Sequence, residues 1–155
     1  LVRFDENEIR VMGRSASGVK GIEMDEGYVI GCEIAKEDQE ILVVTENGYG
    51  KKTNKEEYRK TKRGSKGVKA LNITEKNGPI ISIKTLSGDE EVILITNSGM
   101  IIKLDIDQIS KTGRVAQGVK LINLKEGQKV SSTAIVLKQN TEDDVSRETS
   151  KENQS

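Results

Sequence analysis

The chain of 155 residues contains no histidine, no tryptophan and a single cysteine, Cys32. A Cys/His zinc site, a histidine-based nucleophilic triad and a disulfide within the chain are therefore excluded by the residues available. We expect no catalytic residue and no metal ligand here. The simplest expectation for Cys32 is a small buried apolar residue.

Aromatic side chains are also scarce, with one phenylalanine and three tyrosines: Phe4, Tyr28, Tyr49 and Tyr58. Proteins that bind single-stranded nucleic acids stack bases on aromatic side chains. Any nucleic-acid contact of this chain should therefore be made to phosphates.

Long apolar runs are absent as well, since no stretch approaches the roughly 20 apolar residues that cross a membrane, and the first residues do not resemble a signal sequence. Hydrophobic residues make up 34% of the chain and charged residues 32%. We therefore expect a soluble, cytoplasmic protein with modest cores and no membrane partner. The start at Leu1, without a methionine, indicates a piece of a longer protein.

Positive charge is concentrated in residues 51–69, which hold nine of the 25 basic residues and two acids. The net charges of residues 1–50, 51–69, 70–139 and 140–155 are −6, +7, +2 and −3, although the whole chain is neutral. A basic stretch of this kind favours a polyanionic partner, but a solvated surface loop would have the same composition.

A motif ending in Gly-Val-Lys occurs three times, at residues 13–20, 62–69 and 113–120. Each copy has an arginine four residues before the glycine and a lysine two residues after it. These residues are Arg14 with Lys20, Arg63 with Lys69, and Arg114 with Lys120. The copies are 49 and 51 residues apart, and a period near 50 in a strand-rich sequence is typical of propeller blades.

Strand patterns recur at the same period. Residues 41–45 and 49–53 predict a hairpin around Asn-Gly, because this pair supplies the positive φ that a tight turn requires. Residues 92–96 and 100–104 repeat the hairpin. The inner strands, 41–44 and 92–95, should be buried on both faces because their apolar residues do not alternate with polar ones.

Two further strands are expected in each unit. The motif continues into a strand over 67–73, and a last strand is predicted over 80–85, with counterparts at 28–34 and 130–137. Short helical turns are expected at 55–58 and 105–109, where the segments are too short for a stable helix.

The sequence therefore predicts an all-β protein of propeller-like blades, each with about four antiparallel strands. The first blade, residues 1–39, is incomplete because residues 1–4 align with the second half of a hairpin, whereas 40–89 and 90–139 are whole. Residues 140–155 hold five acids and little to bury, which predicts a disordered acidic tail.

The glycine spacing at 13–20 and 113–120 also matches a phosphate-binding P-loop. However, valine stands where the P-loop lysine should follow, no Ser or Thr can ligate magnesium, and a strand follows instead of a helix. Nucleotide binding is therefore rejected. A tight turn between blades would explain the glycines, but not the recurring arginine and lysine.

Four segments, residues 10–22, 44–52, 57–59 and 109–122, closely resemble the C-terminal domain of the DNA gyrase A subunit. The resemblance covers residues 1 to about 139. It implies a β-pinwheel, a propeller-like ring of blades that exchange strands, of which this chain would form a partial ring of the last blades. It also implies a basic rim that wraps duplex DNA without reading its sequence.

The family's wrapping motif reads Gln-Arg-Arg-Gly-Gly-Lys-Gly and normally lies in the first blade. Residues 61–67 read Thr-Lys-Arg-Gly-Ser-Lys-Gly and agree with it at Arg63, Gly64, Lys66 and Gly67. We interpret this segment as a blade copy and not as the wrapping motif itself.

The basic stretch and the repeat predict a set of exposed DNA-binding residues: Arg14, Lys20, Lys51, Lys52, Arg59, Lys60, Lys62, Arg63, Lys66, Lys69, Arg114 and Lys120. By resemblance, the parent is an ATP-dependent type II topoisomerase that introduces negative supercoils, and its catalytic tyrosine and ATP site lie elsewhere. ATP and magnesium would belong to the parent and no cofactor to this piece. The implied partners are duplex DNA, the rest of the gyrase A subunit and the gyrase B subunit.

Two alternatives remain open from the sequence. One is the corresponding domain of the topoisomerase IV A subunit. The other is a protein-interaction propeller whose basic stretch binds an acidic partner.

Overall fold

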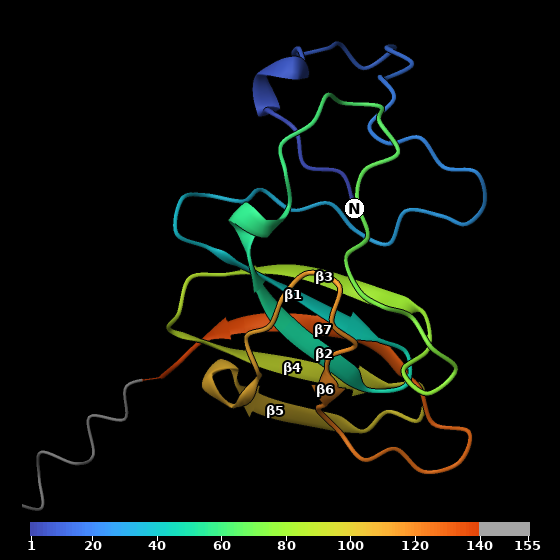
Figure 1. Ribbon diagram of the computed structural model, residues 1–155, viewed down its shortest axis with the longest axis vertical. Coiled ribbons are helices and arrows are strands. Elements are labelled where there is room, and N and C mark those ends of the chain that lie inside the picture. Colours follow the sequence, from blue (N-terminus) through green and yellow to red (C-terminus); the bar gives the residue numbers. More distant parts are fainter. Residues whose placement is uncertain (140–155) are drawn as a thin grey trace, which may run out of the picture.

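The computed structural model describes residues 1–139, which form two antiparallel sheets (Figure 1). The middle sheet has the order β3-β1-β2-β6, with strands Ile80–Leu86, Glu40–Thr45, Tyr49–Asn54 and Val119–Lys120. The last sheet has the order β5-β4-β7, with strands Ile101–Asp105, Glu90–Thr96 and Val130–Leu137. The predicted all-β class is confirmed, while the predicted tail lies outside the described residues.

Each predicted hairpin forms, as β1 with β2 and β4 with β5. A short 3-10 helix follows each one, η2 at Lys55–Glu57 and η3 at Ile106–Gln108, and a third, η1, spans Glu6–Glu8. The side chains of Asn54 and Asp105 accept backbone N–H bonds at 3.0 and 2.9 Å and so cap η2 and η3. The two predicted helical turns are thus confirmed.

Strand β1 is buried on both faces, as predicted. Leu42 and Val44 join a core cluster shared with the last sheet, while Ile41 and Val43 join a second cluster with Tyr58 that extends toward residues 1–39. The middle sheet therefore lies between two layers of apolar contacts.

Strand β4 departs from the prediction, because its burial alternates along the strand. Val92 and Leu94 are buried against the middle sheet, whereas Ile93 and Ile95 are half-buried. The described residues place no further sheet against this second face. Only one face of β4 has a full set of apolar neighbours.

The middle sheet is completed by a strand from the following unit. In β6, Val119 pairs with Gly50 and Lys120 pairs with Tyr49 on β2. We predicted that the corresponding segment, 67–73, forms a strand within its own unit, and this is wrong. In that segment Val68 instead exchanges backbone hydrogen bonds with Leu1, at 2.8 and 2.9 Å.

Residues 1–39 contain η1 but no strand ladder (Figure 1). The strand predicted over 28–34 does not form, because β3 and β7 each pair with the first strand of a hairpin and residues 1–39 hold no such strand. Tyr28 and Ile34 are consequently 79% and 73% exposed. Cys32 lies in the same segment and is exposed, contrary to the expectation that it is buried.

No helix among residues 1–139 has the length and apolar character needed to cross a bilayer.

Candidate nucleic-acid interface

The Gly-Val-Lys motifs lie where one unit meets the next, at two places that we call junctions. At the first junction, residues 60–68 contact residues 1–23, and Figure 1 shows this green segment running beside the blue one. At the second junction, residues 110–121 contact the β2 strand and residues 69–77. Equivalent backbone bonds link Thr61 to Arg3 at 2.7 Å and Thr112 to Lys52 at 2.9 Å.

The recurring arginine forms a hydrogen bond between its own unit and the preceding one. The Arg63 guanidinium donates to the Lys20 carbonyl at 2.6 Å, and the Arg114 guanidinium donates to the Lys69 carbonyl at 2.6 Å. Both arginines are half-buried and not fully exposed as expected. This bond between units gives the arginine a structural role that its spacing in the sequence does not reveal.

The glycine of the motif is required because two backbones approach closely. Gly67 and Gly118 both have φ of +79°. A Cβ atom on Gly118 would lie 2.7 Å from the Gly50 carbonyl oxygen, and one on Gly67 would overlap the carbonyl of Leu1. Glycine avoids both the overlap and the cost of a positive φ.

As a consequence, each junction sets a lysine beside an arginine. Lys20 and Lys69 use their carbonyl groups in these bonds, and their side chains are exposed. Their ammonium groups therefore face solvent, and each guanidinium keeps further N–H donors, since arginine carries five. The pairs Lys20 with Arg63 and Lys69 with Arg114 recur at successive junctions.

A third exposed lysine of the motif, Lys120, lies over the ring of Tyr49. Its Nζ atom is 5.9 Å from the ring centroid, and Lys76 approaches the same ring at 5.7 Å. Such cation–π contacts orient an ammonium group without neutralising its charge. Lys76 lies outside the basic stretch and was not among the predicted residues, because only the fold brings it to Tyr49.

Lys51 and Lys52 do not lie on the surface as expected. Lys51 is fully buried on β2, and its Nζ donates to the carbonyls of Gly113 and Arg114 at 2.6 and 2.5 Å. Burial lowers its pKa to about 8, and Glu57 opposes that shift. Lys52 is also buried, with its Nζ 3.6 Å from Glu40. Both lysines thus belong to the inner side of the second junction.

Several cations of the basic stretch and of the first motif pair with acids of the first unit. Lys60 meets Asp5 at 2.6 Å, Lys66 meets Asp25 at 3.1 Å, and Lys20 meets Glu23 at 3.7 Å. The hydrogen bond from Lys60 is the main cause that lowers the pKa of Asp5 to about 2. The acidic first unit therefore offsets part of the neighbouring positive charge.

Three predicted residues, Arg14, Arg59 and Lys62, are exposed, and within residues 1–139 no carboxylate lies at ion-pair distance from them. The same part of the chain contains no group of three or more His, Cys, Asp or Glu side chains that could hold a metal ion.

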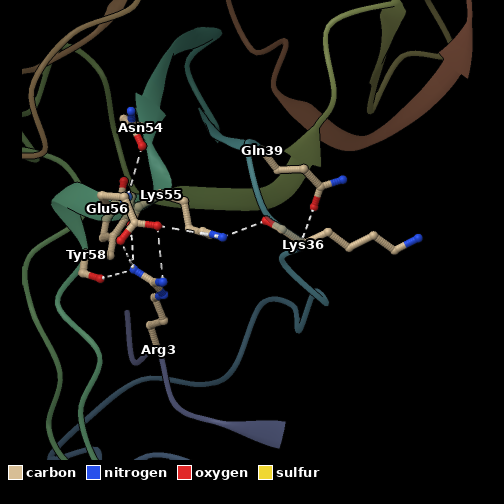
Figure 2. A network of polar contacts seen from close by, with 7 residues as sticks. All are labelled: Arg3, Lys36, Gln39, Asn54, Lys55, Glu56 and Tyr58. Atoms are coloured by element: carbon tan, nitrogen blue, oxygen red, sulfur yellow. Dashed lines mark hydrogen bonds and ion pairs between the residues drawn. The ribbon is translucent and has the colours of Figure 1, made fainter.

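A polar network fixes the start of the basic stretch against the first unit (Figure 2). Arg3 donates to the carbonyls of Lys55 and Tyr58 at 3.1 and 3.0 Å and pairs with Glu56 at 3.2 Å. The hydrogen bond from Arg3 is the main cause that lowers the pKa of Glu56. Lys55 in turn donates to the Lys36 carbonyl at 2.7 Å. Arg3 occupies the repeat position of Lys52, and the two residues form equivalent backbone bridges, with Lys60 and with Lys111.

A family model described as the DNA gyrase C-terminal domain, beta-propeller, matches residues 1–36, 39–87 and 90–136. The chain belongs to this family. Its relatives include the DNA gyrase A subunit of Staphylococcus epidermidis, 51% identical over 147 residues that cover 93% of this chain and 16% of that protein. The subunit of Staphylococcus aureus is 48% identical over 151 residues, covering 96% of this chain and 17% of that protein. The chain therefore spans about one sixth of the length of these gyrase A subunits.

Solved structures of this family have the same fold. A DNA gyrase A C-terminal domain aligns with a TM-score of 0.77 at 26% identity, over 86% of this chain and 46% of the other. The C-terminal domain of DNA topoisomerase IV aligns with a TM-score of 0.79 at 28% identity, over 86% of this chain and 42% of the other. The fold alone does not separate gyrase from topoisomerase IV, whereas the two staphylococcal relatives, at 51% and 48% identity, are gyrase A subunits.

Proposed function

We propose that this chain binds duplex DNA through the cations at its two junctions and bends it along the path from one junction to the next. The residues are Lys20, Arg63, Lys69, Arg114 and Lys120, together with the exposed Arg14, Arg59, Lys60, Lys62 and Lys66 of the first motif and the basic stretch. The observation that carries the proposal is the recurrence of a lysine–arginine pair at successive junctions. Cations that recur from unit to unit attract the negatively charged backbone of DNA.

Phosphate contacts are sufficient for this function. Each lysine or arginine that neutralises a phosphate releases condensed counterions, which favours binding. Bending 20 to 30 base pairs costs about 1–6 kcal/mol, and several such contacts can offset this cost. Phosphate contacts carry no sequence information by themselves, so binding should not depend on sequence.

The relatives support a wider role. We propose that the chain is a non-catalytic part of an ATP-dependent type II topoisomerase, where wrapping one duplex presents a nearby segment for passage and biases the product toward negative supercoils. Its partners would be the rest of the A subunit and the B subunit, in the cytoplasm, with ATP and magnesium bound elsewhere. The high identity to gyrase A subunits favours gyrase over topoisomerase IV.

The proposal can be tested with Lys69→Ala and Lys120→Ala, because both side chains are exposed. The slope of log K against log salt changes by about 0.9 for each phosphate contact on duplex DNA. We expect each single change to flatten the slope by about 0.9 and the double change by about 1.8, equally for unrelated DNA sequences. Fluorescence anisotropy across a salt series measures this slope.

The matched control is Lys36→Ala, since Lys36 is also exposed and its side chain points away from the polar network in Figure 2. This change should leave the slope unaltered. An unchanged slope in the double variant would instead contradict phosphate contact at the second junction. Binding to an acidic protein but not to duplex DNA would favour the interaction propeller.

A further inference from the structure

Lys76 is an exposed cation that belongs neither to the motifs nor to the basic stretch. It lies in the segment 72–78, which follows the middle motif and contains a turn. No acidic group among the described residues lies at ion-pair distance from the Nζ atom of Lys76 or of Lys120. Both ammonium groups therefore keep their full charge for a partner.

The turn that carries Lys76 is held in place by hydrogen bonds to other parts of the second junction. Asn77 is buried, and its side-chain amide donates to the carbonyls of Asn72 at 2.9 Å and of Gln117 at 3.1 Å. Asn47, from the hairpin of β1 and β2, donates to the Lys76 carbonyl at 3.2 Å. Because Gln117 belongs to the last motif, these bonds fix the backbone of Lys76 relative to that motif.

The side chain of Lys76 is also held, because it shares an aromatic ring with Lys120. The two Nζ atoms lie 5.7 and 5.9 Å from the centroid of Tyr49, which is half-buried on β2. Contact with the ring limits the positions of a long, flexible side chain and leaves its charge intact. A side chain that is already ordered loses less entropy when it binds a partner.

We propose that Lys76 is a further DNA-contacting residue and that Tyr49 positions it, so that Lys76 and Lys120 bind one stretch of DNA backbone. The inference rests on the proposed DNA binding and extends its surface from the motifs to the turn at 72–78. Duplex DNA carries one negative charge for about every 1.7 Å of its axis. Neighbouring phosphates can therefore meet both ammonium groups.

The repeat indicates that this site belongs to the second junction. Counted from the turn glycines Gly27, Gly78 and Gly127, the position of Lys76 is occupied by Asp25 in the first unit and by Lys125 in the last unit. In the last unit, Met100 stands at the position of Tyr49. Lys125 thus has the same place in its turn and the same exposure, but no aromatic ring at the repeat position.

The contact is tested with Lys76→Ala, which removes an exposed side chain. We expect the slope of log K against log salt on duplex DNA to flatten by about 0.9, and by about 1.8 in the double variant with Lys120→Ala. Lys125→Ala is the matched control and should leave the slope unaltered. Fluorescence anisotropy across a salt series makes the comparison.

The positioning role is tested at Tyr49. Tyr49→Phe keeps the ring and should bind DNA like wild-type. Tyr49→Met introduces the residue found at the same position of the last unit, and urea unfolding checks that its fold is retained. It should weaken binding about two- to fivefold, since an exposed cation–π contact is worth about 0.5–1 kcal/mol. The salt slope should stay the same because both ammonium groups remain.

The outcomes separate this inference from the wider DNA proposal. If Lys120→Ala flattens the slope and Lys76→Ala does not, the inference is overturned and DNA binding by the motif stands. If neither change flattens the slope, both proposals fail at the second junction. Equal flattening by Lys76→Ala and Lys125→Ala, or equal binding by Tyr49→Met and Tyr49→Phe, overturns the role of the ring.

Discussion

The two junctions share their backbone contacts but differ in what stabilises them. At the second junction, β6 pairs with a strand inside a complete hairpin, and the buried Lys51 binds two carbonyls of the arginine loop. At the first junction, the partner is the segment from Leu1 to Arg3, which belongs to no sheet among the described residues, and exposed ion pairs such as Lys60–Asp5 and Lys66–Asp25 link the two units. Exposed ion pairs therefore contribute at the first junction, in addition to the apolar contacts of Leu1 and Val68, whereas a buried ammonium group contributes at the second junction.

The two junctions should respond differently to salt. Exposed ion pairs contribute little and are screened as ionic strength rises. Buried hydrogen bonds are hardly screened. The stability of the first junction should therefore fall more than that of the second as salt is added.

The largest expected effect is that of Gly118→Ala on stability. The new Cβ atom would overlap the Gly50 carbonyl, and residue 118 must keep a positive φ, so we expect the free energy of unfolding to fall by about 2–4 kcal/mol. Gly67→Ala should cost less, because the segment that its Cβ atom would overlap, at Leu1, belongs to no sheet among the described residues and can shift more easily. Urea unfolding followed by circular dichroism measures both.

Gly27→Ala serves as a reference, because Gly27 has φ of +98° and open space around it. Its loss should show the cost of the positive φ alone, about 1–2 kcal/mol. Equal losses of stability for Gly118→Ala and Gly67→Ala would mean that the cost does not depend on whether the partner segment belongs to a sheet. The contrast between the junctions would then have to be withdrawn.

The buried Lys51 predicts a pH dependence that belongs to the second junction. Its pKa falls from an ordinary value of 10.5 to about 8 in the folded chain, so the unfolded chain binds its proton more tightly. The free energy of unfolding should therefore rise between about pH 8 and pH 10.5, by about 1–3 kcal/mol, and be independent of this group below pH 8.

Lys51→Met should remove this rise, and the fold should tolerate it because Val2 and Ile102 occupy the equivalent repeat positions. Lys36→Met, which alters an exposed lysine, should retain it. Urea midpoints measured from pH 7 to pH 10.5 make the comparison. A rise that persists in Lys51→Met would place its origin in another group.

Local features of the fold could be predicted from the sequence. Both hairpins and the turns at η2 and η3 depend on neighbouring residues, namely the turn glycines and the capping side chains of Asn54 and Asp105. Burial of both faces of β1 also followed from its continuous apolar run.

The features that were missed depend on contacts between units. Residues 28–34 have strand-forming side chains but no inner strand to pair with. In residues 67–73 single contacts take the place of a strand ladder, such as those of Val68 with Leu1 and of Asn72 with Ala116. In the sequence, nothing in the basic stretch itself distinguishes Lys51 from the exposed lysines around it. Its alignment with Val2 and Ile102 was a signal of burial, whereas the bond from each arginine to a carbonyl of the preceding unit has no counterpart in the sequence pattern.

The smallest expected effect concerns Asp25, which pairs with Lys66 at the first junction. The equivalent of Lys66 at the second junction is the uncharged Gln117, so only the first junction has such a charge to release. If the junctions bind DNA as proposed, Asp25→Asn should tighten binding about twofold at low salt, since an exposed pair is worth about 0.2–1 kcal/mol. The gain should vanish at high salt because screening removes the contribution of Asp25. Glu126→Gln, an exposed acid in the turn before Gly127, should change nothing in the same anisotropy titration. Weaker binding by Asp25→Asn would mean that Asp25 holds Lys66 in place for the phosphate, and the acidic first unit would then be a positioning element instead of a competitor.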